Sequence, residues 1–297
     1  MKNQAENLKL LVQRMKLDLE EQIQGKGRKT RLITIASGKG GVGKSNFAVN
    51  LAIALADYRQ KVILLDADMG MANIDVILGL SPQYNLAHVI AGEKSISEVV
   101  YDGPKGLKVI PGGTGMYELA NLQDWQIDSF LNKLSHLDGT ADFFLVDASA
   151  GITRSVLSFA LSADEIVIIT TPEITALTDA YGIIKTIRQQ NFKGYIKIVV
   201  NRVTSGAEAA AVYNKLKIAA NRFLKSSIEY LGFIREDTAV PQALKEQNPF
   251  VLSYPHSHAA RDVYAIAAAI TKQETFTQPR RDLKDFFKKV SEHFRWV

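Results

Sequence analysis

The sequence contains no cysteine, which excludes disulfide bonds, thiolate zinc sites and cysteine-held iron–sulfur clusters. It also lacks any run of the roughly 18 consecutive apolar residues that a transmembrane helix needs. The N-terminus has no basic segment followed by an unbroken apolar stretch, so it does not resemble a secretory signal. The five histidines form no ligand-like pair. These absences predict a cytoplasmic protein whose membrane contacts are at most peripheral.

The chain has 297 residues, of which 46% are hydrophobic and 23% charged. This is long enough for one large α/β domain with a substantial core, or for two smaller ones. The formal net charge is +5 and the sequence pI is about 9.1. So mild an excess of positive charge is compatible with binding nucleotide, anionic lipid or DNA, and does not choose among them.

Four segments follow one another along the chain. Residues 1–24 predict an amphipathic helix, because apolar side chains recur there at helical spacing among Lys, Glu and Gln. Residues 25–30 form a Gly- and Lys-rich linker, and residues 31–272 form the main domain. Residues 273–297 comprise a second linker and a short amphipathic helix.

The main domain alternates short β-branched runs with helical stretches, and no repeat of fixed period is visible. Most of the runs are apolar on both faces, as is typical of strands buried in a parallel sheet between helices. The spacing predicts a doubly wound, mostly parallel α/β sheet. The predicted strands are residues 32–36, 62–65, 107–110, 143–146, 166–169 and 196–200.

A glycine-rich segment, Gly38–Ser45, follows the first predicted strand directly and precedes a predicted helix. It fits the phosphate-binding pattern G-x-x-x-x-G-K-[ST], in which backbone N–H groups and the helix N-terminus bind phosphate. We expect Lys44 to reach the β- and γ-phosphates and the Ser45 hydroxyl to bind Mg²⁺. The predicted ATP-binding residues here are Gly38, Gly40, Gly41, Val42, Gly43, Lys44, Ser45 and Asn46.

Lys39 is an additional lysine that phosphate binding within one subunit does not require. With it, the loop resembles that of the deviant Walker A ATPases of the MinD/ParA type, K-G-G-x-G-K-[ST]. In that family the first lysine reaches across a dimer interface to the partner's nucleotide. The resemblance implies a homodimer that holds ATP between its subunits, whereas a solvated lysine is the alternative.

Carboxylates follow two of the predicted strands, at the sheet edge where open α/β folds bind ligands. The resemblance assigns to Asp68 the orientation of the attacking water, and to Asp66 support of the Mg²⁺ shell. Asp147 is the expected Walker B acid, holding Mg²⁺ through water. Family members often carry a hydroxyl directly after this acid, but here the next residues are Ala148 and Ser149. Which hydroxyl takes part, if one does, therefore stays open.

Asn201 and Arg202 follow a further apolar strand. The resemblance implies that this asparagine hydrogen-bonds adenine and so favours ATP over GTP. An asparagine that merely forms a turn is the alternative.

The C-terminal segment, residues 280–297, shows the strongest helical periodicity. Its large apolar residues fall within about 100° of arc, with lysines at the flanks. Such a helix is suited to an anionic bilayer surface, although docking onto its own domain is an alternative. Two helices paired by ATP-dependent dimerisation would bind more tightly than one. The predicted membrane residues are Leu283, Phe286, Phe287, Val290 and Phe294.

The N-terminal residues Asn3–Lys9 read N-Q-A-E-N-L-K and resemble the D-Q-A-x-x-L-R element of the FlhG/YlxH family. Members of this MinD-like family regulate flagellar number and placement. In them the element stimulates the SRP-type flagellar GTPase FlhF, which here implicates Gln4 and Lys9. Lys9 replaces an arginine and loses its bidentate geometry, so Gln4 is the better candidate for positioning water.

The resemblance implies a slow, Mg²⁺-dependent, dimer-dependent ATPase with FlhF, flagellar C-ring proteins and anionic lipid as partners. A MinD-like division-site protein is one alternative, but it leaves the Gln4 segment without a role. ParA-like DNA partitioning is another, but the distinctive basic residues cluster in the Phe-rich helix, so we expect no specific nucleic acid. An iron-carrying ATPase is excluded by the absence of cysteine.

Overall fold

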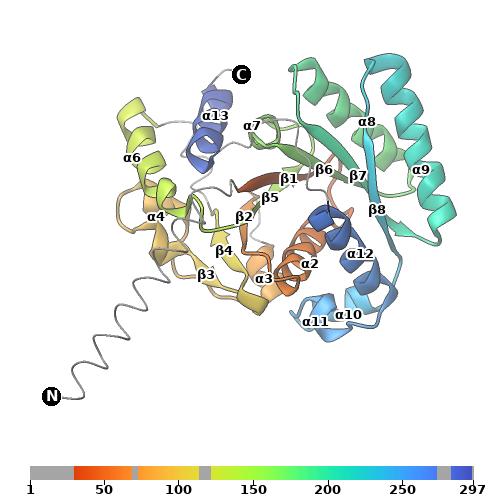
Figure 1. Ribbon diagram of the computed structural model, residues 1–297, viewed down its shortest axis with the longest axis horizontal. Coiled ribbons are helices and arrows are strands. Elements are labelled where there is room, and N and C mark those ends of the chain that lie inside the picture. Colours follow the sequence, from red (N-terminus) through yellow and green to blue (C-terminus); the bar gives the residue numbers. More distant parts are fainter. Residues whose placement is uncertain (1–29, 69–72, 114–121, 273–281, 296–297) are drawn as a thin grey trace.

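Strand β1 (Arg31–Ser37) lies in the middle of an eight-stranded sheet in the computed structural model, which describes residues 30–68, 73–113, 122–272 and 282–295 (Figure 1). The strand order is β3-β4-β2-β5-β1-β6-β7-β8, and every neighbouring pair is parallel except β3 with β4. The predicted doubly wound, mostly parallel sheet is therefore confirmed. The other strands are β2 (Val62–Ala67), β3 (Tyr101–Asp102), β4 (Lys108–Pro111), β5 (Phe143–Ala150), β6 (Glu165–Thr170), β7 (Tyr195–Val203) and β8 (Glu229–Arg235).

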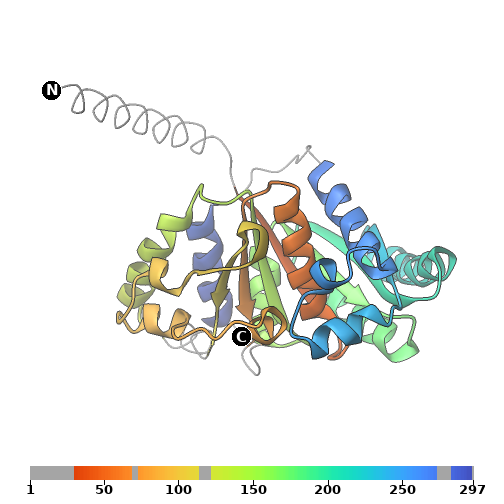
Figure 2. The ribbon, with the colours of Figure 1, turned by 90° about the horizontal axis from the view of Figure 1, so that it is seen from below.

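Helices cover both faces of the sheet, which explains why its central strands are apolar throughout (Figures 1 and 2). One face packs against α2 (Lys44–Asp57) and α12 (His258–Lys272). The opposite face packs against α6 (Asp124–Leu134), α7 (Arg154–Ser162), α8 (Ile174–Gln189), α9 (Gly206–Ala219) and α13 (Leu283–Arg295). The shorter helices are α3 (Ile74–Leu78), α4 (Leu86–Ile90), η1 (Ile96–Val99), η2 (Pro104–Gly106), η3 (Ser135–Leu137), η4 (Ala220–Leu224), α10 (Ala239–Lys245) and α11 (Phe250–Ser253).

The amino ends of β1, β6 and β7 are joined by a buried ionic cluster. The Glu165 carboxylate accepts hydrogen bonds from Arg31, with Nη2 at 2.8 Å, and pairs with Lys197 Nζ at 2.7 Å. Burial alone raises the pKa of Glu165, but the hydrogen bonds and charges of both cations outweigh it and leave the pKa lowered. Removing one member would leave a buried charge unpaired, so this cluster fixes the sheet edge opposite the phosphate loop.

Helix α13 lies beside α6 and α7, and its apolar face is part of the domain core (Figures 1 and 2). The Phe286 ring centroid is 6.1 Å from that of Phe144 and 6.2 Å from that of Phe159. The Phe287 ring meets Phe130 at 5.9 Å. All five predicted membrane residues are buried: Leu283, Phe286, Phe287, Val290 and Phe294.

In the conformation described, this face is docked on the domain, which is the alternative named for it, and its binding to a bilayer stays a prediction. Aromatic rings from β5, α6 and α7 form the surface against which α13 packs. The opposite side of α13, which carries Lys284 and Lys288, stays exposed. The same periodicity serves a bilayer or a protein core, so the sequence pattern could not separate the two. Across the described ranges, no helix is long and apolar enough to cross a membrane.

Candidate active site

The phosphate loop joins β1 to α2 at the carboxyl edge of the sheet, as the motif predicts. Gly41 and Gly43 take the left-handed conformation, with φ of 78° and 91°, which glycine adopts without steric cost. Helix α2 begins at Lys44 and has no side-chain N-cap hydrogen bond. Its N-terminal N–H groups therefore point at the position that a phosphate would occupy.

Gly38 brings this loop into direct contact with α8. A Cβ atom built on Gly38 would lie 2.3 Å from the backbone carbon and oxygen of Asp179 and 2.7 Å from the Ala180 nitrogen. Gly40, two residues further on, would meet nothing within 4 Å. Helix α8 therefore supports the start of the loop, and only glycine fits at position 38.

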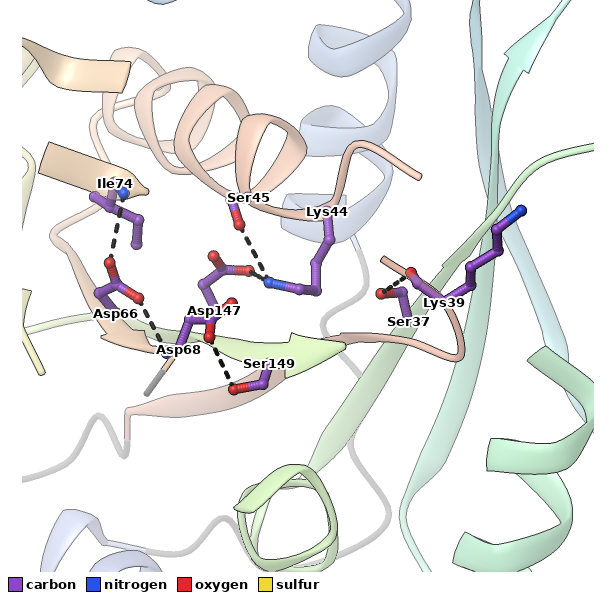
Figure 3. A network of polar contacts seen from close by, with 9 residues as sticks. All are labelled: Ser37, Lys39, Lys44, Ser45, Asp66, Asp68, Ile74, Asp147 and Ser149. Atoms are coloured by element: carbon purple, nitrogen blue, oxygen red, sulfur yellow. Dashed lines mark hydrogen bonds and ion pairs between the residues drawn. The ribbon is translucent and has the colours of Figure 1, made fainter. Parts of the chain in front are cut away.

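Lys44 points into the sheet edge, where its charge pairs with Asp147, the expected Walker B acid (Figure 3). Its Nζ lies 2.6 Å from Asp147 Oδ1 and donates a 3.2 Å hydrogen bond to Ser45 Oγ. Burial raises the pKa of Asp147, and the charge and hydrogen bond of Lys44 oppose that increase. The other oxygen, Asp147 Oδ2, is buried and has no hydrogen-bond partner.

Asp66 stands beside Asp147, because the parallel register of β2 and β5 pairs the two residues directly. Burial, followed by the nearby Asp147 charge, raises the pKa of Asp66 to about 7. The backbone N–H groups of Asp68 and Ile74 donate to its carboxylate at 3.0 and 3.4 Å. Two buried carboxylates at one point are electrostatically unfavourable, and a bound cation would relieve them.

Asp68 follows β2, and its carboxylate meets a hydroxyl from β5. Ser149 Oγ donates to Asp68 Oδ1 at 3.1 Å (Figure 3). Of the two residues after Asp147, Ser149 thus approaches the site, whereas Ala148 is packed in the core on the opposite face of the sheet.

Lys39 points away from this cluster, toward the N-terminus of α8 (Figure 3). Its Nζ lies 2.8 Å from Glu173 Oε2 and 3.1 Å from Thr175 Oγ1. The hydrogen bond and charge of Lys39 lower the pKa of Glu173. The Lys39 and Glu173 side chains are both substantially exposed. Ile174, which lies between Glu173 and Thr175 in the sequence, is 82% exposed. Lys39 therefore lies on an open, partly apolar rim beside the phosphate loop.

Asn201 lies near the carboxyl end of β7, next to the same loop. Its Nδ2 donates to the Val42 carbonyl oxygen at 2.7 Å, so the side chain contacts the glycine-rich turn. Arg202 follows with a φ of 57° and an exposed side chain. The structure thus brings the predicted base-binding asparagine to the phosphate loop, whereas Arg202 remains at the surface.

The residues at the site fit a magnesium ion that is shared with a nucleotide. In the ranges covered by the structure, no three His, Cys, Asp or Glu side chains could hold a metal by themselves. Magnesium in phosphate-transfer sites is commonly bound by one or two protein oxygens, water and substrate phosphates. Ser45, Asp66 and the unpartnered Asp147 Oδ2 provide such oxygens at one point.

Sequence reasoning gave no contact role to three further contributors to the site. Glu173 and Thr175 hold Lys39, and the Asp179 backbone supports Gly38. These contacts join segments about 135 residues apart, and no motif spacing signals them. Predicted residues Gln4 and Lys9 lie outside the described residues.

A glycine-rich turn between a buried strand and a helix, with a lysine and strand-end carboxylates around it, defines a P-loop nucleoside triphosphatase. The comparisons give the family. A family model described as "ParA: NUBPL iron-transfer P-loop NTPase" matches residues 28–271. The chain belongs to this ParA/MinD family of P-loop NTPases.

Similar proteins include two with flagellar names. The chain is 35% identical over 263 residues to the antiactivator FleN of Pseudomonas aeruginosa, covering 89% of this chain and 94% of FleN. It is 35% identical over 266 residues to the flagellum site-determining protein YlxH of Helicobacter pylori, covering 88% and 90%. Among solved structures, the septum site-determining protein MinD of Pyrococcus horikoshii, complexed with Mg-ADP, matches with a TM-score of 0.66 and 26% identity. That match covers 82% of this chain and 96% of MinD.

Proposed function

We propose that this protein is an ATP-hydrolysing dimerisation switch that regulates the number or placement of flagella. Similarity to FleN and YlxH over nearly the whole of each protein supports the flagellar role. The position of Lys39 supports the switch. It lies on an exposed rim beside Ile174, where a second subunit could exchange the Glu173 contact for its own nucleotide.

ATP binding would redistribute the charges at the loop. Lys44 leaves Asp147 for the β- and γ-phosphates, which frees a buried carboxylate for the magnesium shell together with Ser45 and Asp66. When bound, magnesium neutralises charge on the phosphates. Asp68 orients the attacking water, and Asn201 is close enough to the loop to read the adenine base. Lys39 of the partner subunit completes the site.

The docked α13 gives the switch a membrane output. In the conformation described, its apolar face is packed on α6 and α7. We propose that ATP-dependent dimerisation releases this helix, so that two copies bind anionic lipid together. A single short amphipathic helix binds weakly, and two linked copies gain affinity through effective concentration.

The N-terminal segment would serve a second enzyme. Gln4 and Lys9 stand in the element that resembles the activator of the flagellar GTPase FlhF. FlhF and the flagellar C-ring proteins are therefore the proposed partners of the full chain.

Sedimentation with phosphatidylglycerol vesicles tests the switch. The full chain with MgATP should sediment with vesicles more than with MgADP, and Lys44→Ala and Lys39→Ala should both remove the difference. Equal sedimentation in ATP and ADP would count against a nucleotide-controlled membrane state. Vesicle binding that persists in both variants would show that the helix acts without the ATPase.

GTP turnover by the flagellar SRP-type GTPase tests the pathway. The full chain and a peptide of residues 1–24 should both stimulate turnover, and Gln4→Ala should abolish the effect. If neither stimulates, a division-site role like that of MinD becomes the better interpretation of an ATP-dependent membrane switch. Salt-sensitive DNA binding by a chain lacking residues 280–297 would instead favour a partitioning role.

A further inference from the structure

Ser149 and Asp68 face each other because of the register of the sheet. Strands β2 and β5 are parallel, and Asp66 pairs with Asp147 and Ala67 with Ala148. One further step along both chains sets Asp68 opposite Ser149. The register of β5 against β1 shifts between Asp147 and Ala150, so the position of Ser149 follows from its hydrogen bond to Asp68 and not from strict alternation of side chains.

The contact depends on a departure from the family pattern. A hydroxyl directly after the Walker B acid would stand at position 148, on the other face of the sheet, where Ala148 packs in the core. In this chain the hydroxyl is carried by Ser149, one residue further along the strand. Strand β5 also continues to Ala150, which pairs with Ser37, and the Gly151 N–H donates to the Ser37 carbonyl at 2.8 Å. The strand backbone thus carries Ser149 to the level of Asp68.

Hydrogen bonds at the main chain and at the side chain both orient Asp68. Its backbone N–H donates to Asp66 Oδ1 at 3.0 Å, and its Oδ1 accepts from Ser149 Oγ at 3.1 Å. The first contact fixes the main chain directly after β2, and the second fixes the rotation of the carboxylate.

We propose that Ser149 is a positioning residue for ATP hydrolysis, because its hydroxyl holds the Asp68 carboxylate in the orientation that aligns the attacking water. This inference rests on the role of Asp68 in the proposed function. Ser149 does not itself contact the nucleotide in this account. It acts before ATP arrives, by linking the loop after β2 to the rigid end of β5.

Steady-state hydrolysis by the full chain at varied MgATP tests this role. Ser149→Ala should lower kcat roughly tenfold, since small misplacements of a reacting group carry costs of this order, while KM changes less than about twofold. Ser149→Thr retains the hydroxyl and should keep about half of the activity or more. Ser149→Val has the shape of the threonine without the hydroxyl, and it should behave like the alanine variant. Ser226→Ala, remote from the loop on η4's C-terminal side, is the control and should match the wild type.

A double-mutant comparison separates the two proposals. Ser149→Ala should have no further effect in an Asp68→Asn background, because the hydroxyl acts through that carboxylate. An unchanged or increased kcat in Ser149→Ala, or equal activity of the threonine and valine variants, would overturn the positioning role. If Asp68→Asn itself hydrolyses ATP like the wild type, the proposed role of Asp68 fails instead.

Discussion

The two lysines of the phosphate loop pair with different carboxylates. Lys44 neutralises Asp147 inside the domain, whereas Lys39 contacts Glu173 at the surface. The buried pair lies in low-dielectric surroundings, so Lys44 and Asp147 would each need another charged partner if they separated. The exposed pair is screened by solvent and adds little to stability, so a second subunit would have little to displace there.

The contact between Gly38 and α8 leads to a matched pair of glycine substitutions. Gly38→Ala forces Cβ into the Asp179 backbone and should lower the free energy of unfolding by about 1–3 kcal/mol. Gly40→Ala meets open space and should change it by no more than about 0.5 kcal/mol. Chemical denaturation of the nucleotide-free protein measures both. Equal stability of the two variants would mean that the loop does not need α8.

Part of this site follows from the sequence. Gly38–Ser45 with Asp66, Asp68 and Asp147 could be grouped, because carboxyl ends of parallel strands meet at one edge. The role of Ser149 depends on the register between β2 and β5, which a strand pattern alone does not fix. Glu173 is likewise placed by the tertiary packing of α8 against the loop.

At the level of elements, α13 forms part of the domain core. Its five apolar residues complete the cluster formed by α6, α7 and β5. The predicted strand at residues 107–110 appears as β4 with a shift of one residue, and the two-residue β3 carries too little pattern to predict. The periodicity of residues 283–294 predicted a helix correctly. It could not predict what the apolar face of that helix contacts, because the contacting rings of Phe130, Phe144 and Phe159 are distant in sequence.

Weakening the surface on which α13 docks, without changing α13 itself, should increase the binding of α13 to lipid vesicles. Phe130→Ala removes a buried ring that contacts Phe287, a change that typically costs about 3–5 kcal/mol. The variant should bind phosphatidylglycerol vesicles without ATP, since docking and lipid compete for one face. Trp125→Ala removes an exposed ring from α6, the helix that also carries Phe130, and should behave like the wild type. No gain in Phe130→Ala would show that docking does not limit membrane binding.

The N-terminus of α13 should make the free energy of unfolding depend on pH. Asp138 accepts a 2.8 Å hydrogen bond from the Leu283 N–H. Burial raises the pKa of Asp138 above its ordinary value of 3.8, and the negative charges of Asp282 and Asp285 raise it further. The hydrogen bond from Leu283 and the positive charge of Lys284 lower the pKa, but they do not cancel the increase. The folded chain therefore keeps this proton to higher pH than the unfolded chain.

Between the ordinary and the raised pKa, the folded state binds more protons, so the free energy of unfolding falls as pH rises. Asp138→Asn keeps an acceptor for Leu283 and removes the titration. Its stability relative to the wild type should therefore increase as pH rises from about 4 to about 6. Denaturant midpoints across this range measure the effect. Asp128→Asn, an exposed position on α6, is the control. Parallel curves for wild type and Asp138→Asn would contradict it.

For the whole molecule, the proposed dimer implies that each active site draws on both subunits. A two-fold interface exchanges Lys39 in both directions, while Lys44 serves its own nucleotide. Lys39→Ala and Lys44→Ala should each be inactive alone. In a mixed dimer, the Lys39→Ala subunit keeps its own Lys44 and receives Lys39 from the other chain.

Mixing equal amounts of the two variants should therefore restore about a quarter of wild-type ATPase activity, because half of the dimers are mixed and each has one complete site. ATP turnover against the mixing ratio measures this. No restoration at any ratio would show that Lys39 acts on the nucleotide of its own subunit.

Strand β1 also separates two ends of the molecule. It begins at Arg31, in the buried ionic cluster, and ends at Ser37, where the phosphate loop starts. Seven residues of strand span roughly 20 Å. Residues 1–29 therefore join the domain at the edge remote from the nucleotide. In the proposed dimer closed over ATP, both Arg31 positions would therefore lie away from the shared nucleotides, which would leave the closed interface and the proposed GTPase contact at opposite edges of the sheet.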